Sequence, residues 1–223
     1  MKKAPERLRF SALAVDAVVL GIVDGELCGL VSEVNRPPYY VNILGFLGGL
    51  INIEENADEA CERVLYEKGG LKNVYVEQLY TFSEVERDKR NRVISVAYIA
   101  LVRPDTAASY KFADASFVPL KKLKNLAYDH DEMLQMAKSR LQGKFAYTNI
   151  AQYLLPRHFT LSELQATYEI VLQKEFDKRN FRKKVLSLDL VKETGLVQDG
   201  VKNRPAALYE FSSQKIKEFQ LLT

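Results

Sequence analysis

The sequence has few cysteines, no long apolar run and little net charge. Only Cys28 and Cys61 occur in 223 residues, without a Cys-x-x-Cys pair, so neither a disulfide framework nor a zinc site is indicated, and both cysteines are expected to be inert. No apolar run reaches the roughly 18 residues of a membrane span, and the start MKKAPERLRF has no apolar segment after its charges. We therefore expect no membrane contact, no signal peptide and residence in the cytoplasm.

What is present is apolar content and an uneven distribution of charge. The chain is 47% hydrophobic, which suffices for one large core or two modest ones. Residues 151–223 contain 12 Lys and Arg against 9 Asp and Glu, whereas residues 1–150 contain 20 of each. The net charge of +3 therefore lies in the C-terminal third. Such an excess fits contact with phosphates, although a solvated charged surface is the commoner cause.

The first two thirds of the chain have the pattern of a mixed sheet with one helix. Residues 10–23 are almost all apolar, and Asp24-Gly25 predicts a turn into a second strand, LCGLV. A polar loop at 35–38 and a Gly-rich turn precede a helix predicted from Ala57 to Lys68 and ended by Gly69-Gly70. Two further strands are predicted at 74–82 and 93–102.

The last third has a different pattern. A helix predicted from Asp129 to about Phe145 leads to a boundary near residue 150. Thr160 and Glu163 have the spacing of a capping box at the start of one helix, and Asp177 can cap a second. Two strands, LVKET and AALYEF, follow on either side of a Gly- and Lys-containing tip. Helix, turn, helix and hairpin is the order of a winged helix-turn-helix.

The segment around the first helix resembles the Nudix signature G-x5-E-x7-R-E-U-x-E-E-x-G-U, in which U is aliphatic. Seven of the nine specified positions match, and these are Gly49, Glu55, Arg63, Leu65, Glu67, Gly70 and Leu71. The two departures are Val64 and Lys68, which stand where the signature has glutamate. In the Nudix family the three glutamates of R-E-U-x-E-E share one helix face and hold Mg²⁺.

With two of those three glutamates missing, we expect no catalysis, no metal and no cofactor. Valine has no oxygen for a cation, and the ammonium of a lysine repels one. The alternative is an active hydrolase of ADP-ribose or a related nucleoside diphosphate that uses carboxylates outside the signature, such as Glu84 or Glu86, beside Glu55 and Glu67. A retained Nudix architecture without its metal ligands instead favours a domain that binds a small molecule.

Candidate residues for binding that effector come from the signature, from the loops that border the cleft in Nudix proteins and from the segment LAYDHDEML. Arginine suits phosphates and ribose hydroxyls. The alternatives remain that Glu55 and Arg63 form a structural ion pair, that the loop arginines are solvated charges, and that the histidine is a helix cap or surface residue. The candidates are Arg36, Glu55, Arg63, Glu67, Arg87, Arg92 and His130.

In the second C-terminal helix, Phe181, Val185 and Leu188 share one face, which turns Arg179 and Lys183 to the opposite side. Such a helix can bond phosphates or base edges in a major groove, and the hairpin tip can contact the backbone or minor groove. The alternative is a basic face that serves solubility. The candidate DNA contacts are Lys178, Arg179, Asn180, Arg182, Lys183, Ser187, Lys202, Asn203 and Arg204.

Residues 154–169, FDKRNFRKKV and RPAALYEF resemble the winged helix of the Nudix-related transcriptional regulators. The resemblance implies an α+β chain with a Nudix mixed-sheet α/β/α sandwich at 1–148 and a winged helix-turn-helix at 149–223. It also implies a homodimer, most often a repressor of genes of NAD or sugar metabolism, that leaves double-stranded operator DNA when ADP-ribose or a sugar binds. A winged domain that contacts protein instead is the third possibility. Effector, operator and target genes stay open.

Overall fold

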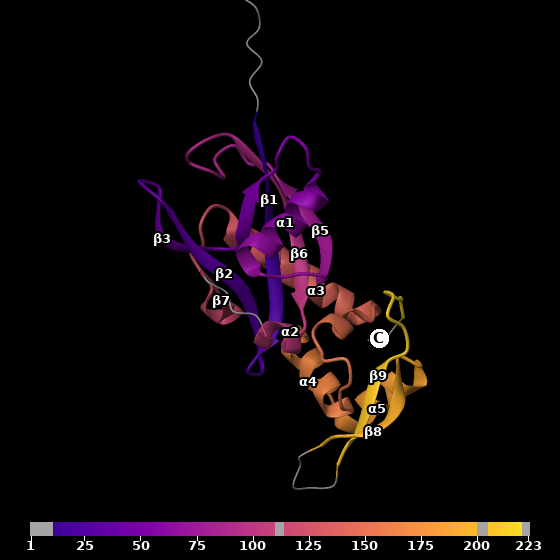
Figure 1. Cartoon of the computed structure of the whole chain (residues 1–223). Helices are drawn as coiled ribbons and strands as arrows, with labels where there is room; N and C mark the ends of the chain where they lie inside the picture. The colour runs from indigo at the N-terminus through magenta and orange to yellow at the C-terminus, as the bar shows by residue number, and fades with distance from the viewer. Residues whose placement is uncertain (1–10, 110–113, 200–204, 220–223) are drawn as a thin grey trace, which may run out of the picture.

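Strand β1 (Ala12–Val23) is the centre of a seven-stranded mixed sheet, seen in the upper part of Figure 1. The computed structural model describes residues 11–109, 114–199 and 205–219. β1 is buried from Ala14 to Gly21, as expected of an apolar strand covered on both faces. It pairs in parallel with β6 (Val93–Val102) and antiparallel with β2 (Glu26–Arg36) and β4 (Leu47–Leu50). The outer strands are β5 (Tyr75–Phe82) on β6, and β3 (Tyr40–Gly45) and β7 (Ala115–Pro119) on β2.

Helices cover both faces of this sheet. On one face α1 (Ala57–Gly69) buries Ala60, Cys61, Val64 and Leu65 against β1 and β6. On the other face α3 (His130–Tyr147) packs through residues such as Met133 and Leu141. The predicted boundaries of α1 are confirmed to within one residue. The helix begins after Asn56, which forms a capping box with Glu59, and Gly70 at φ 63° provides its left-handed C-cap.

The segment predicted as a Gly-rich turn is instead strand β4, which pairs with the first half of β1. The physical reason is close packing at two glycines. A Cβ on Gly48 would overlap Oδ1 of Asp16, and one on Gly49 would lie 2.9 Å from Cγ2 of Val64. Glycine lets the strand approach a buried carboxylate on one side and helix α1 on the other.

The C-terminal part has the predicted order of helix, helix and hairpin, in the lower part of Figure 1. Thr160 and Glu163 form the predicted capping box of α4 (Leu161–Leu172), and Asp177 caps α5 (Lys178–Ser187). Strands β8 (Val191–Val197) and β9 (Ala207–Phe211) form the hairpin. Short elements complete the chain: α2 (Pro104–Ser109), η1 (Leu120–Lys122) and η2 (Ile150–Tyr153).

A continuous apolar cluster joins the two parts. The ring of Phe145 in α3 lies 4.9 Å from that of Tyr168 in α4, and Tyr168 lies 5.5 Å from Phe181 in α5. Ile150 and Leu154, which connect α3 to α4, are buried in the same cluster. The division at residue 148 stays a prediction, since the chain crosses it inside this core.

Both cysteines are free and buried, as expected of inert residues. Among the described residues, no helix has the length and apolar character needed to cross a membrane.

Candidate functional site

The Nudix-like segment turns Val64 and Lys68, four residues apart on α1, toward the glycines of β4. Val64 is fully buried, and the ammonium of Lys68 donates a hydrogen bond to the carbonyl of Gly48. Burial lowers the pKa of Lys68, although the nearby carboxylate of Asp16 opposes this shift. Glu67 points elsewhere, with 53% of its side chain exposed. At the two positions where glutamate of the signature is replaced, β4 therefore contacts an apolar side chain, Val64, and a cation, Lys68.

Glu55 and Arg63 form an ion pair that ties the β4–α1 loop to the helix. Nε of Arg63 donates to Oε2 of Glu55 at 2.9 Å, and its Nη2 donates to the carbonyl of Leu50 at 2.9 Å. Hydrogen bonds from Arg63 and from the amide of Asn52 lower the pKa of Glu55 to about 2. Nη1 of Arg63 also reaches Glu67 at 3.3 Å. This geometry is that of the structural ion pair considered from the sequence.

Beneath β4 lies a buried polar network centred on Asp16. Nε of Arg87 donates to Oδ2 of Asp129 at 2.8 Å, and its Nη2 donates to Oδ2 of Asp16 at 3.1 Å. Ser95 donates to the same oxygen of Asp16 at 2.6 Å. The network joins β1, β6, the loop after β5 and the start of α3. Buried charges need such partners, because an unpaired one is costly to desolvate.

His130, the first residue of α3, completes this network. The backbone amide of Phe46 donates to its Nδ1 at 2.9 Å, so the proton of the neutral ring lies on Nε2, which faces Oδ1 of Asp16 at 3.3 Å. The contact with His130, the charge of Arg87 and the hydrogen bond from Ser95 lower the pKa of Asp16, although burial alone would raise it. The histidine is a core residue, neither the surface residue nor the open-cleft residue weighed from the sequence.

Sequence reasoning missed Asp16 and Ser95, yet one signal was available. Asp16 is the one charged residue within the apolar strand β1, and a carboxylate at such a position requires a buried partner. Nothing comparable marked Ser95. The network also means that Arg87, predicted as a loop residue for ligand, has only 3% of its side chain exposed.

An aromatic and basic cluster lies beside the network. The rings of Tyr40 and Tyr128 are 4.4 Å apart, and the guanidinium of Arg90, paired with Asp88, lies 5.5 Å from the Tyr128 ring centre. Arg36, exposed at the end of β2, is near enough to Lys68 to help lower its pKa. Neither tyrosine was among the predicted site residues.

The predicted effector residues thus have three environments. Arg36, Glu67 and Arg92 are exposed, and Nη1 of Arg92 donates to the carbonyl of Glu84 at 3.0 Å. Glu55 and Arg63 are half-buried in their ion pair, while Arg87 and His130 are buried. Among the described residues, no group of three or more His, Cys, Asp and Glu side chains is arranged to hold a metal ion.

Helix α5 presents a basic outer surface. Phe181 and Val185 are buried as predicted, and Leu188 is half-buried beside them. The side chain of Asp177 accepts from the amide of Asn180 at 2.8 Å. Arg182 differs from the other predicted contacts, because its Nη2 donates to Oγ of Ser162 in α4 at 3.0 Å. The predicted contacts that are exposed are Lys178, Arg179, Asn180, Lys183 and Ser187.

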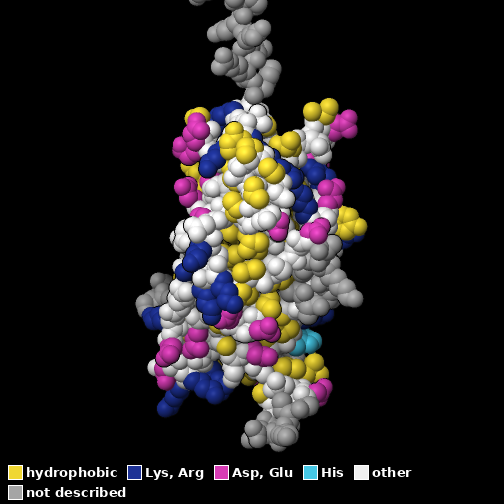
Figure 2. Space-filling model, turned by 90° about the vertical axis from the view of Figure 1, so that its left-hand side faces the viewer, with side chains coloured by type: hydrophobic (Ala, Val, Ile, Leu, Met, Phe, Trp, Pro, Cys, Tyr) yellow, Lys and Arg dark blue, Asp and Glu magenta, His cyan; other side chains and the backbone are white. Residues whose placement is uncertain are grey.

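Figure 2 shows basic side chains gathered at the lower end of one face, at the level of α4 and α5 in Figure 1. Among the described residues, no carboxylate forms an ion pair with a basic side chain of α5. The three predicted contacts at the hairpin tip, Lys202, Asn203 and Arg204, lie outside the described residues.

A family profile described as "NrtR DNA-binding winged helix domain" matches residues 151–211. The chain is 33% identical over 208 residues to the "ADPR responsive transcriptional repressor NtrR" of Acinetobacter baylyi, which covers 91% of this chain and 82% of that protein. The chain belongs to the NrtR family. The fold class predicted from the sequence, a Nudix sandwich followed by a winged helix, is confirmed with it.

Solved members of the NrtR family agree in fold. The crystal structure of Shewanella oneidensis NrtR with a 27mer DNA matches with a TM-score of 0.78 at 32% identity, covering 89% of this chain and 93% of that one. The NUDIX domain of the same NrtR, solved with ADP ribose, matches with a TM-score of 0.53 at 29% identity, covering 62% of this chain and 93% of that one.

An ADP-ribose pyrophosphatase of Methanocaldococcus jannaschii is 28% identical in sequence over 125 residues, which are 56% of this chain and 71% of that protein.

Proposed function

We propose that the chain is a transcriptional repressor that binds operator DNA through α5 and releases it when ADP-ribose binds the Nudix-like part. The observation that carries the proposal is the basic outer surface of α5, held by a buried Phe181 and Val185, in a chain 33% identical to an ADPR-responsive repressor. The relative from Shewanella oneidensis was solved with DNA, and its NUDIX domain with ADP ribose.

For DNA, the geometry of α5 supports insertion in a major groove. Its apolar face packs on α4, so Lys178, Arg179 and Lys183 point away from the protein. Lysine and arginine neutralise phosphates, and arginine can also read guanine through two hydrogen bonds. Arg182 acts indirectly in this proposal, since its bond to Ser162 fixes α5 against α4. The predicted contacts Lys202, Asn203 and Arg204 remain part of the proposal.

For ADP-ribose, the chemistry at the end of β2 and at the end of α1, where Lys68 faces β4, is complementary. Arg36 and Lys68 supply positive charge for a pyrophosphate. The half-buried ring of Tyr128, packed on the buried Tyr40 and beside Arg90, supplies ring area for a nucleoside. Glu67 and Arg92 complete the exposed set. Glu55, Arg63, Arg87 and His130 support this surface from within, which revises their proposed role from ligand contacts to positioning residues.

We also propose that the Nudix-like part does not hydrolyse its ligand. The fold family implies Mg²⁺, and the residues here do not fit this ion. Val64 is buried and has no atom that can bind a metal, and the ammonium of Lys68 donates a hydrogen bond to the carbonyl of Gly48. The similarity to an ADP-ribose pyrophosphatase favours hydrolysis as the second candidate. Incubation with ADP-ribose and Mg²⁺ or Mn²⁺ decides between them: release of AMP above the blank supports the enzyme.

Helix α3 gives the two halves a physical connection. Its first residue, His130, belongs to the network under β4, and near its last turn Phe145 packs on Tyr168 of α4. A ligand that shifts the balance between two positions of α3 would move α5 relative to a second copy, so that two recognition helices no longer match their half-sites.

A homodimer is part of this proposal. The apolar stripe on the face that carries β3 and β2 in Figure 1, visible in Figure 2, supports such a contact.

The experiment is operator binding, measured by fluorescence anisotropy with a labelled fragment from upstream of the chain's own gene. We expect affinity that falls steeply with salt and weakens when ADP-ribose is added. Arg179→Ala should weaken binding of DNA, whereas Arg36→Ala should keep DNA binding and lose the response to ADP-ribose. Light scattering measures the dimer. Failure of the fragment to bind at low salt contradicts the proposal.

A further inference from the structure

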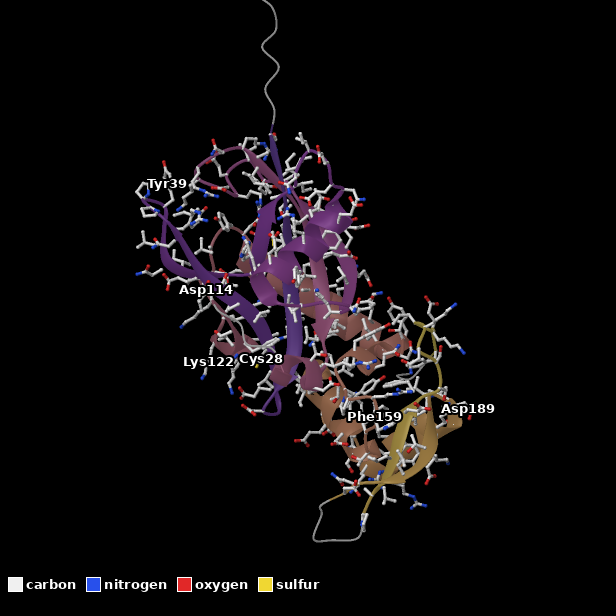
Figure 3. The ribbon with its side chains drawn as sticks, in the orientation of Figure 1. Cys28, Tyr39, Asp114, Lys122, Phe159 and Asp189 are labelled. Carbon is white, nitrogen blue, oxygen red and sulfur yellow. The ribbon has the colours of Figure 1, made fainter. Side chains whose placement is uncertain are left out.

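A cavity of about 410 Å³ lies where the Nudix-like part meets the winged-helix part. One wall comes from the β1–β2 turn and η1, with Leu27 and Leu120, and the other from α3 and α4, with Leu134, Ile170 and Val171. In Figure 3, the labels Cys28 and Lys122 mark the lower end of the Nudix-like part, and Phe159 marks the winged-helix part. None of the predicted site residues lines the cavity, so it is distinct from both candidate sites.

The lining combines apolar walls with three charged side chains. Lys121 is paired with Glu26, so their charges cancel. Lys138 of α3 donates instead to the neutral amide oxygen of Gln173, at 3.1 Å, across the gap to the end of α4. Among the described residues, no carboxylate pairs with Lys138. The cavity thus has one positive charge without a negative partner.

A carboxylate is a stronger partner for this ammonium than an amide oxygen, because a hydrogen bond between two charged groups exceeds one to a neutral acceptor. A ligand carboxylate could therefore replace Gln173 as the acceptor, while its apolar body covers the leucine and isoleucine side chains. The volume lies within the usual range for small-molecule sites, roughly 300 to 1,000 Å³.

We propose that this cavity binds an amphipathic monocarboxylate, with the carboxylate on Lys138 and the apolar body between Leu27 and Ile170. A ligand there contacts both parts of the chain at once and stabilises their present arrangement. The site is independent of the proposed ADP-ribose surface, and its occupancy is measured without DNA or ADP-ribose. The outcome therefore does not depend on the proposed function.

The probe is 4-phenylbutanoate, with 4-phenylbutanamide as its uncharged counterpart, added to the full chain. Saturation-transfer NMR measures binding, and ¹⁵N-resolved spectra follow the side-chain amide of Gln173. We expect the acid to bind at least about tenfold more tightly than the amide, and the Gln173 amide resonance to shift on binding. No transfer with the acid, equal binding of acid and amide, or an unmoved Gln173 resonance overturns the proposal.

Variants locate the bound probe. Lys138→Met removes the ammonium and keeps most of the stem, and it should weaken binding of the acid at least about tenfold. Lys122→Met removes an equal charge from η1. Lys122 is not among the residues that line the cavity, so this variant should leave binding unchanged. Ile170→Phe should reduce binding by filling the cavity. Unchanged binding in Lys138→Met or in Ile170→Phe places the probe elsewhere and overturns the proposal.

Discussion

Two arginines of the Nudix-like part differ from the exposed basic residues of α5 in what they contact. Arg63 and Arg87 direct their donors to carboxylates of the same domain, Glu55 in one case and Asp16 with Asp129 in the other. Arg179 and Lys183 are exposed, with no ion pair to any described residue. Basic side chains in this chain therefore have two uses: Arg63 and Arg87 hold the first part together, whereas Arg179 and Lys183 are available to an external partner.

The largest effect is expected from removal of the buried guanidinium of Arg87. Arg87→Met should destabilise the fold by about 3–5 kcal/mol, because it leaves the carboxylates of Asp16 and Asp129 desolvated without their partner. Urea unfolding followed by circular dichroism measures the loss. Arg92→Met is the control, since Arg92 is exposed and bonds one carbonyl, and it should cost less than about 0.5 kcal/mol. Equal losses in the two variants would show that the network is not what holds this region together.

A second test concerns the outer surface of α5. Replacing Arg179 and Lys183 together by alanine should leave stability nearly unchanged and weaken operator binding by about 1–3 kcal/mol if one of them reads a base, with a salt slope reduced by roughly 1 for each phosphate that is no longer neutralised. Anisotropy titrations at several salt concentrations measure both quantities. The matched control, Lys122→Ala with Lys124→Ala, removes the same charge from the other part of the chain. If it weakens binding equally, net charge rather than the face of α5 is responsible.

The sequence predicts the winged-helix part better than the buried network of the Nudix-like part. The amphipathic pattern of α5 and the caps at Thr160 and Asp177 are local signals, and the structure has these elements as expected. Arg87 and His130 instead contact Asp16, which lies 71 and 114 positions earlier in the chain, and no local pattern brings such residues together. Strand β4 was missed for a related reason: its glycines resemble a turn until the close approach of Asp16 and Val64 is known.

Helix caps allow a smaller and symmetrical comparison. Asn56 caps α1 and Asp177 caps α5, each through an oxygen that accepts from a backbone amide. Replacing either by alanine should cost about 1 kcal/mol. Only Asp177→Ala should also weaken operator binding, because the first turn of α5 carries Lys178 and Arg179. Thermal melts and anisotropy measure the two effects, and equal DNA affinity in both variants would argue against α5 as the reading helix.

The smallest expected effect is the pH dependence of the Glu55–Arg63 pair. The pKa of Glu55 falls from an ordinary 4.5 to about 2 in the fold, chiefly through the hydrogen bond from Arg63. A carboxyl whose pKa is depressed by folding stabilises the protein above its unfolded pKa, and that contribution is lost as pH falls from 4.5 toward 2. Glu55→Gln should therefore flatten this part of the stability curve, measured as urea midpoints at a series of pH values. Glu54→Gln, at an exposed neighbour, should leave the curve unchanged, and an identical slope in Glu55→Gln would mean that other carboxyls carry the acid response.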